Sequence, residues 1–484
     1  VNAPIPLSIR AEGRLPGTDA RFTLAARLPG GDGPPVLELE VPDLPLGEIG
    51  SLLPADWPVA WDRASADGTL AVELLGGGAE IAIRGQVNVS GLGLAHERIA
   101  ASPLADLAAN TDFKIAWDRA ANVVHLERLL ISRGRAHFTL RGDVRTDRLA
   151  FDARLNLPPT ACRHVLGAIP PELRSGPGEM QLEGTFGLDL TVAIDVDAPG
   201  ETVLEAELDN RCRIGEWGDL PAPDQYRRPF TYQAYDEWGG RLRLVTGPGT
   251  DRWTPLGQIS PYLVEASLTT EDGKFRGHAG LTVPELRRAI ELNLQNRSLT
   301  HGASTITMQL AKNLFLSRER TIERKLQELF YVWYLESFFS KDEILELYFN
   351  IVEFGPSLYG IRDAATHYFG RDPHELNLAE SVFLIKLLPS PVIRHAAYER
   401  GEVSERKMTS LQRVMRTMRA RGRITEAELQ AGLSQRIEFH QEGDPLPPPR
   451  IPPERDGFRL SPAGDFGDYE PEETEDATWE SETP

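Results

Sequence analysis

The sequence is poor in residues that could build a disulfide framework or a zinc site. Its 484 residues include only two cysteines, Cys162 and Cys212, and no Cys-x-x-Cys pair. Because no cluster of Cys and His has the spacing of zinc ligands, a zinc-finger or zinc-ribbon protein is excluded. Whether the two cysteines are bridged stays open, since a bridge depends on an oxidising compartment.

Long apolar runs are also lacking. No stretch of about 18 apolar residues occurs, so we expect no helix that spans a membrane. The chain begins with Val1 rather than Met. We therefore expect a signal or anchor segment to precede it in the full-length protein.

No region carries the excess of Lys and Arg that nucleic-acid binding requires, and this function is excluded. The net charge is -20. The acidic excess lies before residue 255 and after residue 440, outside the segment that carries the motifs described below. The length allows about three domains of ~150 residues each.

Residues 1–210 have the pattern of an all-β region. Short stretches such as residues 70–74, 138–142 and 190–196 alternate apolar and polar residues or run apolar, with Gly, Pro and Asp between them. This pattern predicts many short strands joined by tight turns.

Two internal echoes indicate a repeat within this β region. The pentapeptide AWDRA at residues 60–64 recurs at residues 116–120. Separately, Leu-Pro steps at residues 44 and 53 are paralleled by Leu-Pro and Ile-Pro steps at residues 157 and 169. We expect two divergent copies of a β-rich unit, each with a short helical insert. The pattern resembles the AsmA-like repeat domains of bacterial envelope proteins, which can present an apolar groove; a plain β-sandwich spacer is the alternative.

Two irregular segments are predicted, one directly after the β region and one at the end of the chain. Residues 441–484 combine a proline-rich stretch with an acidic run and few apolar residues, so we expect a disordered tail. Residues 211–254 are a connector rich in Gly, Pro and aromatic residues, which could bind sugar faces but more commonly pack a domain junction. Its aromatic residues are Trp217, Tyr226, Phe230, Tyr232, Tyr235, Trp238 and Trp253.

Residues 255–440 are predicted to form an all-α domain. Apolar residues recur at helical spacing over residues 283–294, and Pro284 suits a first turn. Residues 321–339 are apolar nearly all round beyond Glu328, which is typical of a buried helix. Two further helix starts are indicated by a capping residue three positions before a Glu, at Ser340-Glu343 and Thr425-Glu428.

Five short sequence blocks, several of them with acidic, basic or hydroxyl side chains, follow one another between residues 271 and 391. A carboxylate that can take a proton and a basic stripe that can hold phosphates indicate transfer chemistry on a phosphorylated donor. In chain order the blocks are EDGKFRGHAG from residue 271, HGASTITMQLAKN from residue 301, RKLQE from residue 324, ILELYFN from residue 344 and YFG from residue 368.

These blocks, in this order and spacing, resemble the five motifs of the peptidoglycan glycosyltransferases, family 51 of the glycosyltransferases. The resemblance covers about residues 250 to 435. It implies a multidomain α+β protein, with the β-rich repeat region at the N-terminus and an all-α, lysozyme-like catalytic domain at residues 255–440. Ala303 stands where the family has Gly and Met308 where it has Gln, which puts details of donor contact in question.

Glu271 is the candidate general base. A carboxylate beside an apolar surface can accept a proton, although acidic residues in a helix's first turn are also common for structural reasons. The resemblance places Glu271 where the family removes the proton from the acceptor 4-hydroxyl, and it makes the neighbouring Asp272 a substrate-binding residue. We interpret His278 as a structural residue rather than a metal ligand.

A second group of residues predicts an anion site. Ser304 and Thr305 follow a Gly at the start of a helix, where hydroxyls and free N–H groups bind anions, although either residue could simply cap the helix. Gln309 is the amide that remains for donor contact. Glu346 and Asn350, four residues apart, are interpreted as scaffold.

A basic stripe precedes the second carboxylate. Arg320, Arg324 and Glu328 recur every four residues on one predicted helix face, with Lys325 beside them and Lys312 upstream. An exposed row of ion pairs is the structural alternative. The resemblance makes Lys312, Arg320, Arg324 and Lys325 the diphosphate-binding residues and Glu328 the second catalytic carboxylate. We predict that these side chains converge on one cleft with Ser304.

The function predicted on this basis is that of an inverting hexosyltransferase. It would polymerise lipid II into β-1,4-linked glycan strands and release polyprenyl diphosphate. The resemblance names Mg²⁺ or Mn²⁺ as helpers, the sequence does not require a metal, and no organic cofactor is expected. Two alternatives remain: an envelope lipid-binding or scaffold protein with an inactive transferase domain, and a lysozyme-like glycan hydrolase, which would not need the basic stripe.

The partners expected are lipid II, the growing glycan strand and the inner-membrane surface at its periplasmic face, with cell-wall synthesis or envelope proteins as further candidates. The amphipathic residues 283–294 are the predicted membrane contact. Ser404 and Lys407 fit Ser-x-x-Lys, but no Lys-Thr-Gly follows, so a penicillin-binding domain is not expected. We also expect an anchored fragment of residues 255–440 to keep some activity without residues 1–210.

Overall fold

The structure is a computed structural model that describes residues 7–14, 19–28, 33–48, 58–174, 180–216, 220–298, 301–319, 321–441 and 443–451. It divides into two compact units, each interrupted in sequence. The first unit comprises Val1–Leu220, Thr282–Ala303 and Glu319–Gln327, and the second comprises Pro221–Leu281, Ser304–Arg318 and Glu328–Pro484. In the described ranges, every helix is too short or too polar to cross a bilayer.

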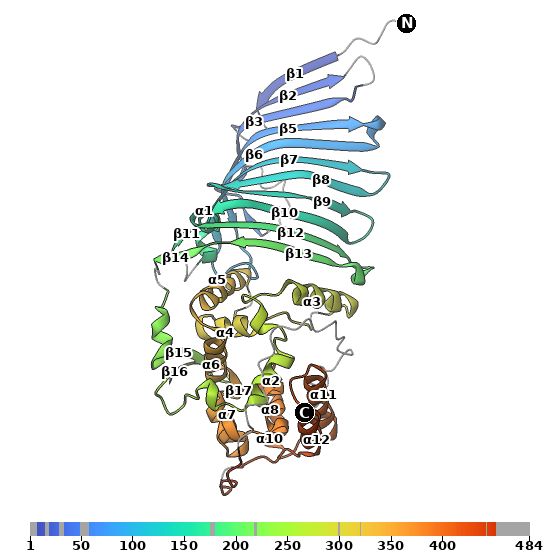
Figure 1. Ribbon diagram of the computed structural model, residues 1–484. Helices are drawn as coiled ribbons and strands as arrows, with labels where there is room; N and C mark the ends of the chain where they lie inside the picture. Colours follow the sequence, from blue (N-terminus) through green and yellow to red (C-terminus); the bar gives the residue numbers. More distant parts are fainter. Residues whose placement is uncertain are drawn as a thin grey trace. The chain divides into compact units, whose positions relative to one another are not determined.

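The first unit is built on one antiparallel sheet of twelve strands (Figure 1). Its neighbours follow the order of the chain from β1 to β13, except that the short β4 pairs with the end of β6. The strands are β1 (Leu7–Arg14), β2 (Arg21–Leu28), β3 (Val36–Pro45), β4 (Val59–Ala60), β5 (Ser65–Leu75), β6 (Glu80–Leu94), β7 (Leu104–Asp118), β8 (Val123–Arg133), β9 (Ala136–Arg145), β10 (Ala150–Ala161), β12 (Thr185–Asp195) and β13 (Val203–Asn210). The prediction of an all-β region is therefore confirmed.

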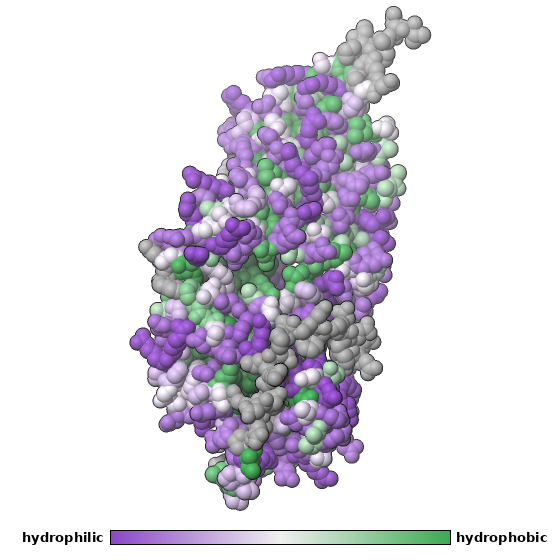
Figure 2. Space-filling model, viewed as in Figure 1, coloured by the Kyte–Doolittle hydropathy of each residue, from purple (hydrophilic) through white to green (hydrophobic). Residues whose placement is uncertain are grey.

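One face of this sheet is apolar from its first strand to its last. Alternation of side chains along each strand puts every second residue on the same face, and the strand register aligns these residues into rows. Figure 2 shows apolar side chains gathered in a band over the strands, with hydrophilic residues on both sides. Ile9 is 57% exposed and Leu208 is 55% exposed, so the face reaches solvent at both edges. One row consists of Ile9, Ala26, Leu37, Val72, Ile83, Ile115, Leu126, Gly142, Ala153, Val192 and Leu204.

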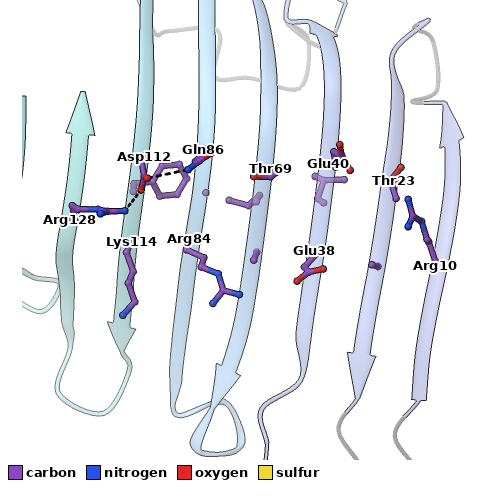
Figure 3. Close-up of a pocket in the computed structure, with 16 residues that line it drawn as sticks. Arg10, Thr23, Glu38, Glu40, Thr69, Arg84, Gln86, Asp112, Lys114 and Arg128 are labelled. Atoms are coloured by element: carbon purple, nitrogen blue, oxygen red, sulfur yellow. Dashed lines mark hydrogen bonds and ion pairs between the residues drawn. The ribbon is translucent and has the colours of Figure 1, made fainter. Parts of the chain in front are cut away.

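The opposite face is polar and carries cross-strand charge pairs. A hollow of about 530 Å³ lies on it across β1 to β8 (Figure 3). Asp112 accepts hydrogen bonds there from Arg128 at 2.5 Å and from Gln86 at 3.3 Å. Pairs of opposite charge on adjacent strands stabilise a sheet, and this accounts for the charged residues of β5 to β8.

The strand connections of the sheet repeat once. β3, β4, β5 and β6 correspond to β10, β11 (Gln181–Glu183), β12, and β13 with β14 (Arg213–Glu216), because β4 pairs with the end of β6 as β11 pairs with β14. The Leu-Pro steps at residues 44 and 157 both lie at register shifts, where a proline that cannot donate is tolerated. These features support the predicted two copies.

The recurring pentapeptide AWDRA, in contrast, does not mark a structural repeat. Residues 60–64 run from the end of β4 into a turn, whereas residues 116–120 finish β7 and enter the β7–β8 turn. Local sequence similarity at turns does not fix strand pairing. The helical insert of the second copy is α1 (Cys162–Ala168), and the corresponding part of the first copy, residues 49–57, lies outside the described residues.

A disulfide joins Cys162 to Cys212, which the sequence left open. Cys162 is the buried first residue of α1, and Cys212 lies between β13 and β14. The bond therefore ties the helical insert to the last strands of the second copy.

Two segments of the predicted helical domain belong to the first unit. The helix α3 (Val283–Gln295) packs against β13, with Thr282 as its N-cap and Pro284 in its first turn. The N–H groups of Ile322 and Glu323 donate to the carbonyls of Arg98 and Ile99 at 2.9 and 2.8 Å. The unit boundaries therefore differ from the predicted boundaries at residues 210 and 255.

The second unit is helical around a buried central helix. Nine of the ten residues of α8 are buried, and α2, α11 and α12 pack against it. The predicted capping boxes at Ser340-Glu343 and Thr425-Glu428 are both present. The helix α5 (Ile322–Phe338) begins in the first unit and enters the second at Glu328. The other helices of the second unit are α2 (Pro261–Thr270), α4 (Ile306–Phe315), α6 (Lys341–Ile351), α7 (Ile361–Phe369), α8 (Leu378–Leu387), α9 (Pro391–Arg394), α10 (Ala396–Glu399), α11 (Glu405–Ala420) and α12 (Glu426–Ser434).

Three predictions for this region need correction. Residues 255–440 are not all-α, because β17 (Glu353–Gly355) pairs with β18 (Leu358–Tyr359); strands of three and two residues are too short to show an alternating pattern. The helix α5 is not buried all round, since Leu329 is 36% exposed. The tail is ordered at its start: Arg450 pairs with Glu380 at 2.5 Å.

Four aromatic side chains of the connector are packed in the interior. The connector contains the hairpin of β15 (Phe230–Tyr235) and β16 (Arg241–Thr246). Tyr226, Phe230, Tyr232 and Trp253 are buried, and Tyr226 contacts both Phe230 and Phe315 edge to face. Trp238 is exposed, and Trp217 lies outside the described residues.

Candidate active site

Glu271 is placed by the end of a buried helix. Eight of the ten residues of α2 are buried, and Glu271 is its C-cap, whose N–H donates to the carbonyl of Ser267. The Glu271 side chain is partly exposed and leaves the buried helix at its last turn. A carboxylate in this position is accessible to a substrate and anchored by a rigid element.

Gln309 holds the Glu271 carboxylate from the neighbouring helix. Its Nε2 donates to Glu271 Oε2 at 2.9 Å, and its Oε1 accepts from the hydroxyl of Tyr348 at 3.0 Å. Tyr348 lies on α6 and is completely buried. Burial, followed by the negative charges of Glu271 and Asp272, raises the pKa of Tyr348 well above its ordinary value, so its hydroxyl stays protonated.

Asp272 is placed in the interior of the second unit. Its carboxylate accepts from His278 Nε2 at 2.8 Å and from the N–H of Ile306 at 3.1 Å. The N–H of Gly280 donates to His278 Nδ1 at 3.0 Å, which puts the imidazole proton on Nε2. With 6% of its surface exposed, Asp272 joins the first two motifs, and its substrate-binding role stays a prediction.

The start of α4 is therefore occupied by the protein's own groups. Thr305 is the N-cap, accepting from the N–H of Met308 at 3.2 Å and donating to the carbonyl of Gly280 at 2.7 Å. Because Asp272 takes the N–H of Ile306, this helix terminus already has its anion. Ser304, the residue before the cap, is exposed.

Lys312 lies on α4 one turn after Gln309, on the same side of the helix, and is exposed. On α5, Arg324 and Glu328 are one turn apart; Lys325 is exposed and Glu328 is buried. Arg320 lies outside the described residues. Arg324 and Lys325 belong to the first unit, and Glu271 and Lys312 belong to the second, so convergence of these side chains stays a prediction.

Sequence reasoning missed two arginines that hold the end of α2. Arg421 donates to the carbonyl of Thr269 at 2.9 Å. Arg423 donates to the carbonyl of Gly273 at 3.0 Å and pairs with Glu265 at 2.7 Å. Both lie after α11, about 150 residues from Glu271, and no motif spacing connects positions so far apart.

The residues interpreted as scaffold hold a neighbouring segment. Glu346 accepts from Trp253 Nε1 at 3.0 Å and from the N–H of Leu256 at 2.8 Å. Asn350 bonds both the N–H and the carbonyl of Thr254, at 2.7 and 2.8 Å. These bonds fit a structural role.

The described residues contain no cluster of three or more His, Cys, Asp or Glu side chains that could hold a metal ion. Assistance by Mg²⁺ or Mn²⁺ therefore stays a prediction from the resemblance. We derive no step through Mg²⁺ or Mn²⁺.

Comparison with known proteins supports the motif assignment. Residues 242–418 match the family model described as transglycosylase. The biosynthetic peptidoglycan transglycosylase of Nitrosomonas eutropha is 44% identical over 140 residues, which are 29% of this chain and 57% of that protein. A crystal structure of penicillin-binding protein 1A from Haemophilus influenzae matches with a TM-score of 0.23 and 20% identity, over 44% of this chain and 21% of that one, too partial a superposition to bear on the fold.

The aligned part of this chain covers different shares of the relatives' own lengths. The chain spans 57% of the Nitrosomonas eutropha protein and 61% of the corresponding protein of Nitrosospira multiformis. The biosynthetic peptidoglycan transglycosylase of Acinetobacter baylyi is 40% identical over 180 residues, which are 37% of this chain and 76% of that protein. At this identity over three quarters of a relative, the chain belongs to the family of biosynthetic peptidoglycan transglycosylases.

Proposed function

We propose that this protein polymerises lipid II into β-1,4-linked glycan strands and releases polyprenyl diphosphate, with inversion at the anomeric carbon. The observation that carries the proposal is Glu271, an accessible carboxylate fixed at the end of a buried helix and oriented by Gln309. The helix that supplies Gln309 also carries the cation Lys312 on the same side. Glycosyl transfer from a diphosphate donor requires two groups, a base and a cation.

The proposed reaction is a single displacement. Glu271 accepts the proton of the acceptor's 4-hydroxyl, and the oxygen forms a bond to the donor's anomeric carbon from the face opposite the diphosphate. The bond between that carbon and the diphosphate oxygen breaks, and its electron pair leaves with the polyprenyl diphosphate. Proton removal by a positioned base contributes about 10²–10⁴-fold in such reactions.

The leaving group needs charge neutralisation more than a proton. We assign this role to Lys312, Arg320, Arg324 and Lys325, because Arg grips phosphate oxygens bidentately and Lys supplies a point charge. Ser304 is exposed and available to the donor, whereas Thr305 and Asp272 act by holding the motif loops together. We propose that the buried Glu328 orients these cations rather than contacting the sugar.

The test is incubation of the anchored full-length protein with purified lipid II, with glycan polymer read out on a gel. Polymer of β-1,4 linkage with release of polyprenyl diphosphate is expected. Release of short saccharides from finished glycan, without consumption of lipid II, would instead indicate the hydrolase alternative.

For the setting of this activity we propose the periplasmic face of the inner membrane, with α3 as the membrane contact. The helix carries exposed Leu286, and Leu281 just before it is also exposed. A lysozyme-like arrangement of the helical region is likewise a proposal that rests on the motif resemblance.

We also propose that the sheet is an AsmA-like module whose apolar face lies against lipid chains. The supporting observation is the in-register apolar row, which runs through every strand of the sheet path from β1 to β13. Ile115→Glu would place a charge on this face. Lys114→Glu, the adjacent residue on the polar face, is the matched control.

Lipid extraction from the purified protein, followed by mass spectrometry, tests this second proposal. We expect co-purified lipid in the wild type and in Lys114→Glu, and its loss in Ile115→Glu. Equal lipid content in all three proteins, or none in the wild type, would contradict a lipid-facing role.

A further inference from the structure

Three side chains form a line of hydrogen bonds that ends at the candidate base. The buried Tyr348 hydroxyl donates to Gln309 Oε1 at 3.0 Å, and Gln309 Nε2 donates to Glu271 Oε2 at 2.9 Å. The three residues come from α6, from α4 and from the end of α2. The line therefore connects the rigid interior of the second unit to the carboxylate.

A glutamine amide can turn either end towards a neighbour, so something must select the end that faces Glu271. If the Gln309 oxygen faced the carboxylate, two acceptors would meet and the hydrogen bond would be lost. The Glu271 carboxylate, which can only accept, therefore takes the amide N–H, and the buried Tyr348 hydroxyl donates its one proton to the oxygen at the other end of the amide. With its oxygen bound to Tyr348, the Gln309 amide is held in the orientation that gives its N–H to Glu271.

The second oxygen of Glu271 lies near the hydroxyl of Thr270. Thr270 Oγ1 lies 3.4 Å from Glu271 Oε1 but also lies 3.1 Å from the carbonyl of Ala266, to which its proton can go. Gln309 thus engages Oε2 and fixes the orientation of the carboxylate through that oxygen. The neighbouring Asp272 carboxylate does not compete for Gln309, since it is bonded to His278 and Ile306.

We propose that Tyr348 is a positioning residue for the transfer reaction, which holds the Gln309 amide and, through it, the orientation of the Glu271 carboxylate towards the acceptor hydroxyl. This inference rests on the proposed function for its catalytic consequence, but not for its structural one. Tyr348 acts through Gln309 and touches neither sugar. Its removal should slow the chemical step without weakening substrate binding.

The test compares Tyr348→Phe with Tyr334→Phe in the full-length protein with lipid II. Tyr334 is a matched control: it is also buried in the second unit, and its hydroxyl donates to a carbonyl, that of Pro221, at 2.6 Å. We expect kcat to fall about 10- to 100-fold in Tyr348→Phe, as for a misplaced catalytic group, with KM within about twofold of the wild type. Tyr334→Phe should keep the wild-type kcat.

A double-mutant cycle separates positioning from general loosening. In a Gln309→Ala background, Tyr348→Phe should cost no more than about twofold, because the residue through which it acts is gone. Losses that multiply in the double variant, or an equal loss in Tyr334→Phe, would overturn the proposal.

A crystal structure of each variant decides the question independently of activity. In Tyr348→Phe the Gln309 side chain should leave Glu271, and in Tyr334→Phe it should remain. If Gln309 still contacts Glu271 in Tyr348→Phe, the inference is wrong whatever the enzyme does. Failure of the wild type to use lipid II, with the expected change in the crystals, would count against the proposed function alone.

Discussion

At the scale of single residues, two adjacent carboxylates have different roles because of where one helix ends. Glu271 caps α2 and is partly exposed, whereas Asp272, the next residue, turns inward to His278 and the start of α4. A one-residue step along the chain therefore separates a group that can exchange a proton from one that holds two loops together.

We predict that conservative changes at these two positions affect different properties, the reaction rate at Glu271 and the stability at Asp272. Glu271→Gln should lose about 10²–10⁴-fold in polymerisation rate with an unchanged melting temperature, since it removes only the base. Asp272→Asn should lower the free energy of unfolding by about 2 kcal/mol, because its NH₂ group would face one of the two buried donors that the carboxylate binds, His278 Nε2 or the Ile306 N–H. Gel assays and thermal unfolding of both variants check this; a stable, fully active Glu271→Gln protein would remove Glu271 from the mechanism.

At the scale of elements, two histidines share one partly buried aromatic cluster; His367 lies on α7 and His395 lies between α9 and α10. His367 on α7 stacks on His395 with ring centroids 5.5 Å apart, and both contact Tyr398 of α10. His395 Nδ1 lies 2.7 Å from the Tyr368 hydroxyl. The cluster joins α7 to α9 and α10 through rings that pack best when neutral.

This cluster predicts acid sensitivity. Burial lowers the pKa of His367 and His395 below the ordinary value of 6.5, and for His395 the charge of His367 adds to the effect. The unfolded chain therefore takes up protons near pH 6.5 while the folded chain does not, so stability is constant above this pH and falls below it. Melting temperatures measured from pH 8 to pH 5 should decline on the acid side.

The variant His367→Phe should flatten this decline, because an apolar ring replaces the imidazole and removes a proton-binding group. His374→Phe, outside the cluster, is the control and should keep the wild-type slope. The same slope in all three proteins would show that other groups govern acid unfolding.

A second element-scale prediction concerns α1 and the last strands of the sheet. The Cys162–Cys212 disulfide closes a loop with a sequence separation of 50 residues. Its removal in Cys162→Ala/Cys212→Ala should cost the first unit about 2–4 kcal/mol, largely through the unfolded state. Calorimetry should show a lower transition for that unit only; coincident shifts of both units would mean that they unfold together.

At the scale of the whole molecule, the region that matches the transglycosylase family is divided between the two units. The Acinetobacter baylyi relative is covered over 76% of its length by 180 aligned residues, which leaves no room in it for a further region of 210 residues. That relative therefore has no counterpart of the whole sheet. Against this, Thr282–Ala303 and Glu319–Gln327 belong to the same unit as the sheet, through contacts such as that of Ile322 with Arg98.

We predict that an anchored variant without residues 1–210 keeps some polymerisation activity but less than the full chain. The loss should be mainly in KM for lipid II. The segment with Arg324 and Lys325 belongs to the same unit as the sheet and loses its contacts with the sheet, whereas the contacts that hold Glu271 lie within the second unit and remain. Steady-state kinetics of both proteins test this. A folded, anchored and wholly inactive variant would make the sheet part of the catalytic machinery.

The sequence by itself determined what depends on neighbours along the chain. Alternating residues gave the strands, helical spacing gave α3, and the capping pair Ser340-Glu343 gave the start of α6. Glu271 was singled out as a candidate base because its motif is local. Each of these features is encoded within about a dozen consecutive residues, where periodicity and capping act.

Only the tertiary structure decided which distant segments meet. It placed Asp272 at the start of α4, Tyr348 behind Gln309, and Arg421 against the end of α2. It also assigned α3 to the sheet and bridged the two cysteines. These contacts join residues from 34 to about 150 positions apart, and no local preference specifies them, because they arise when separate elements bury their faces together.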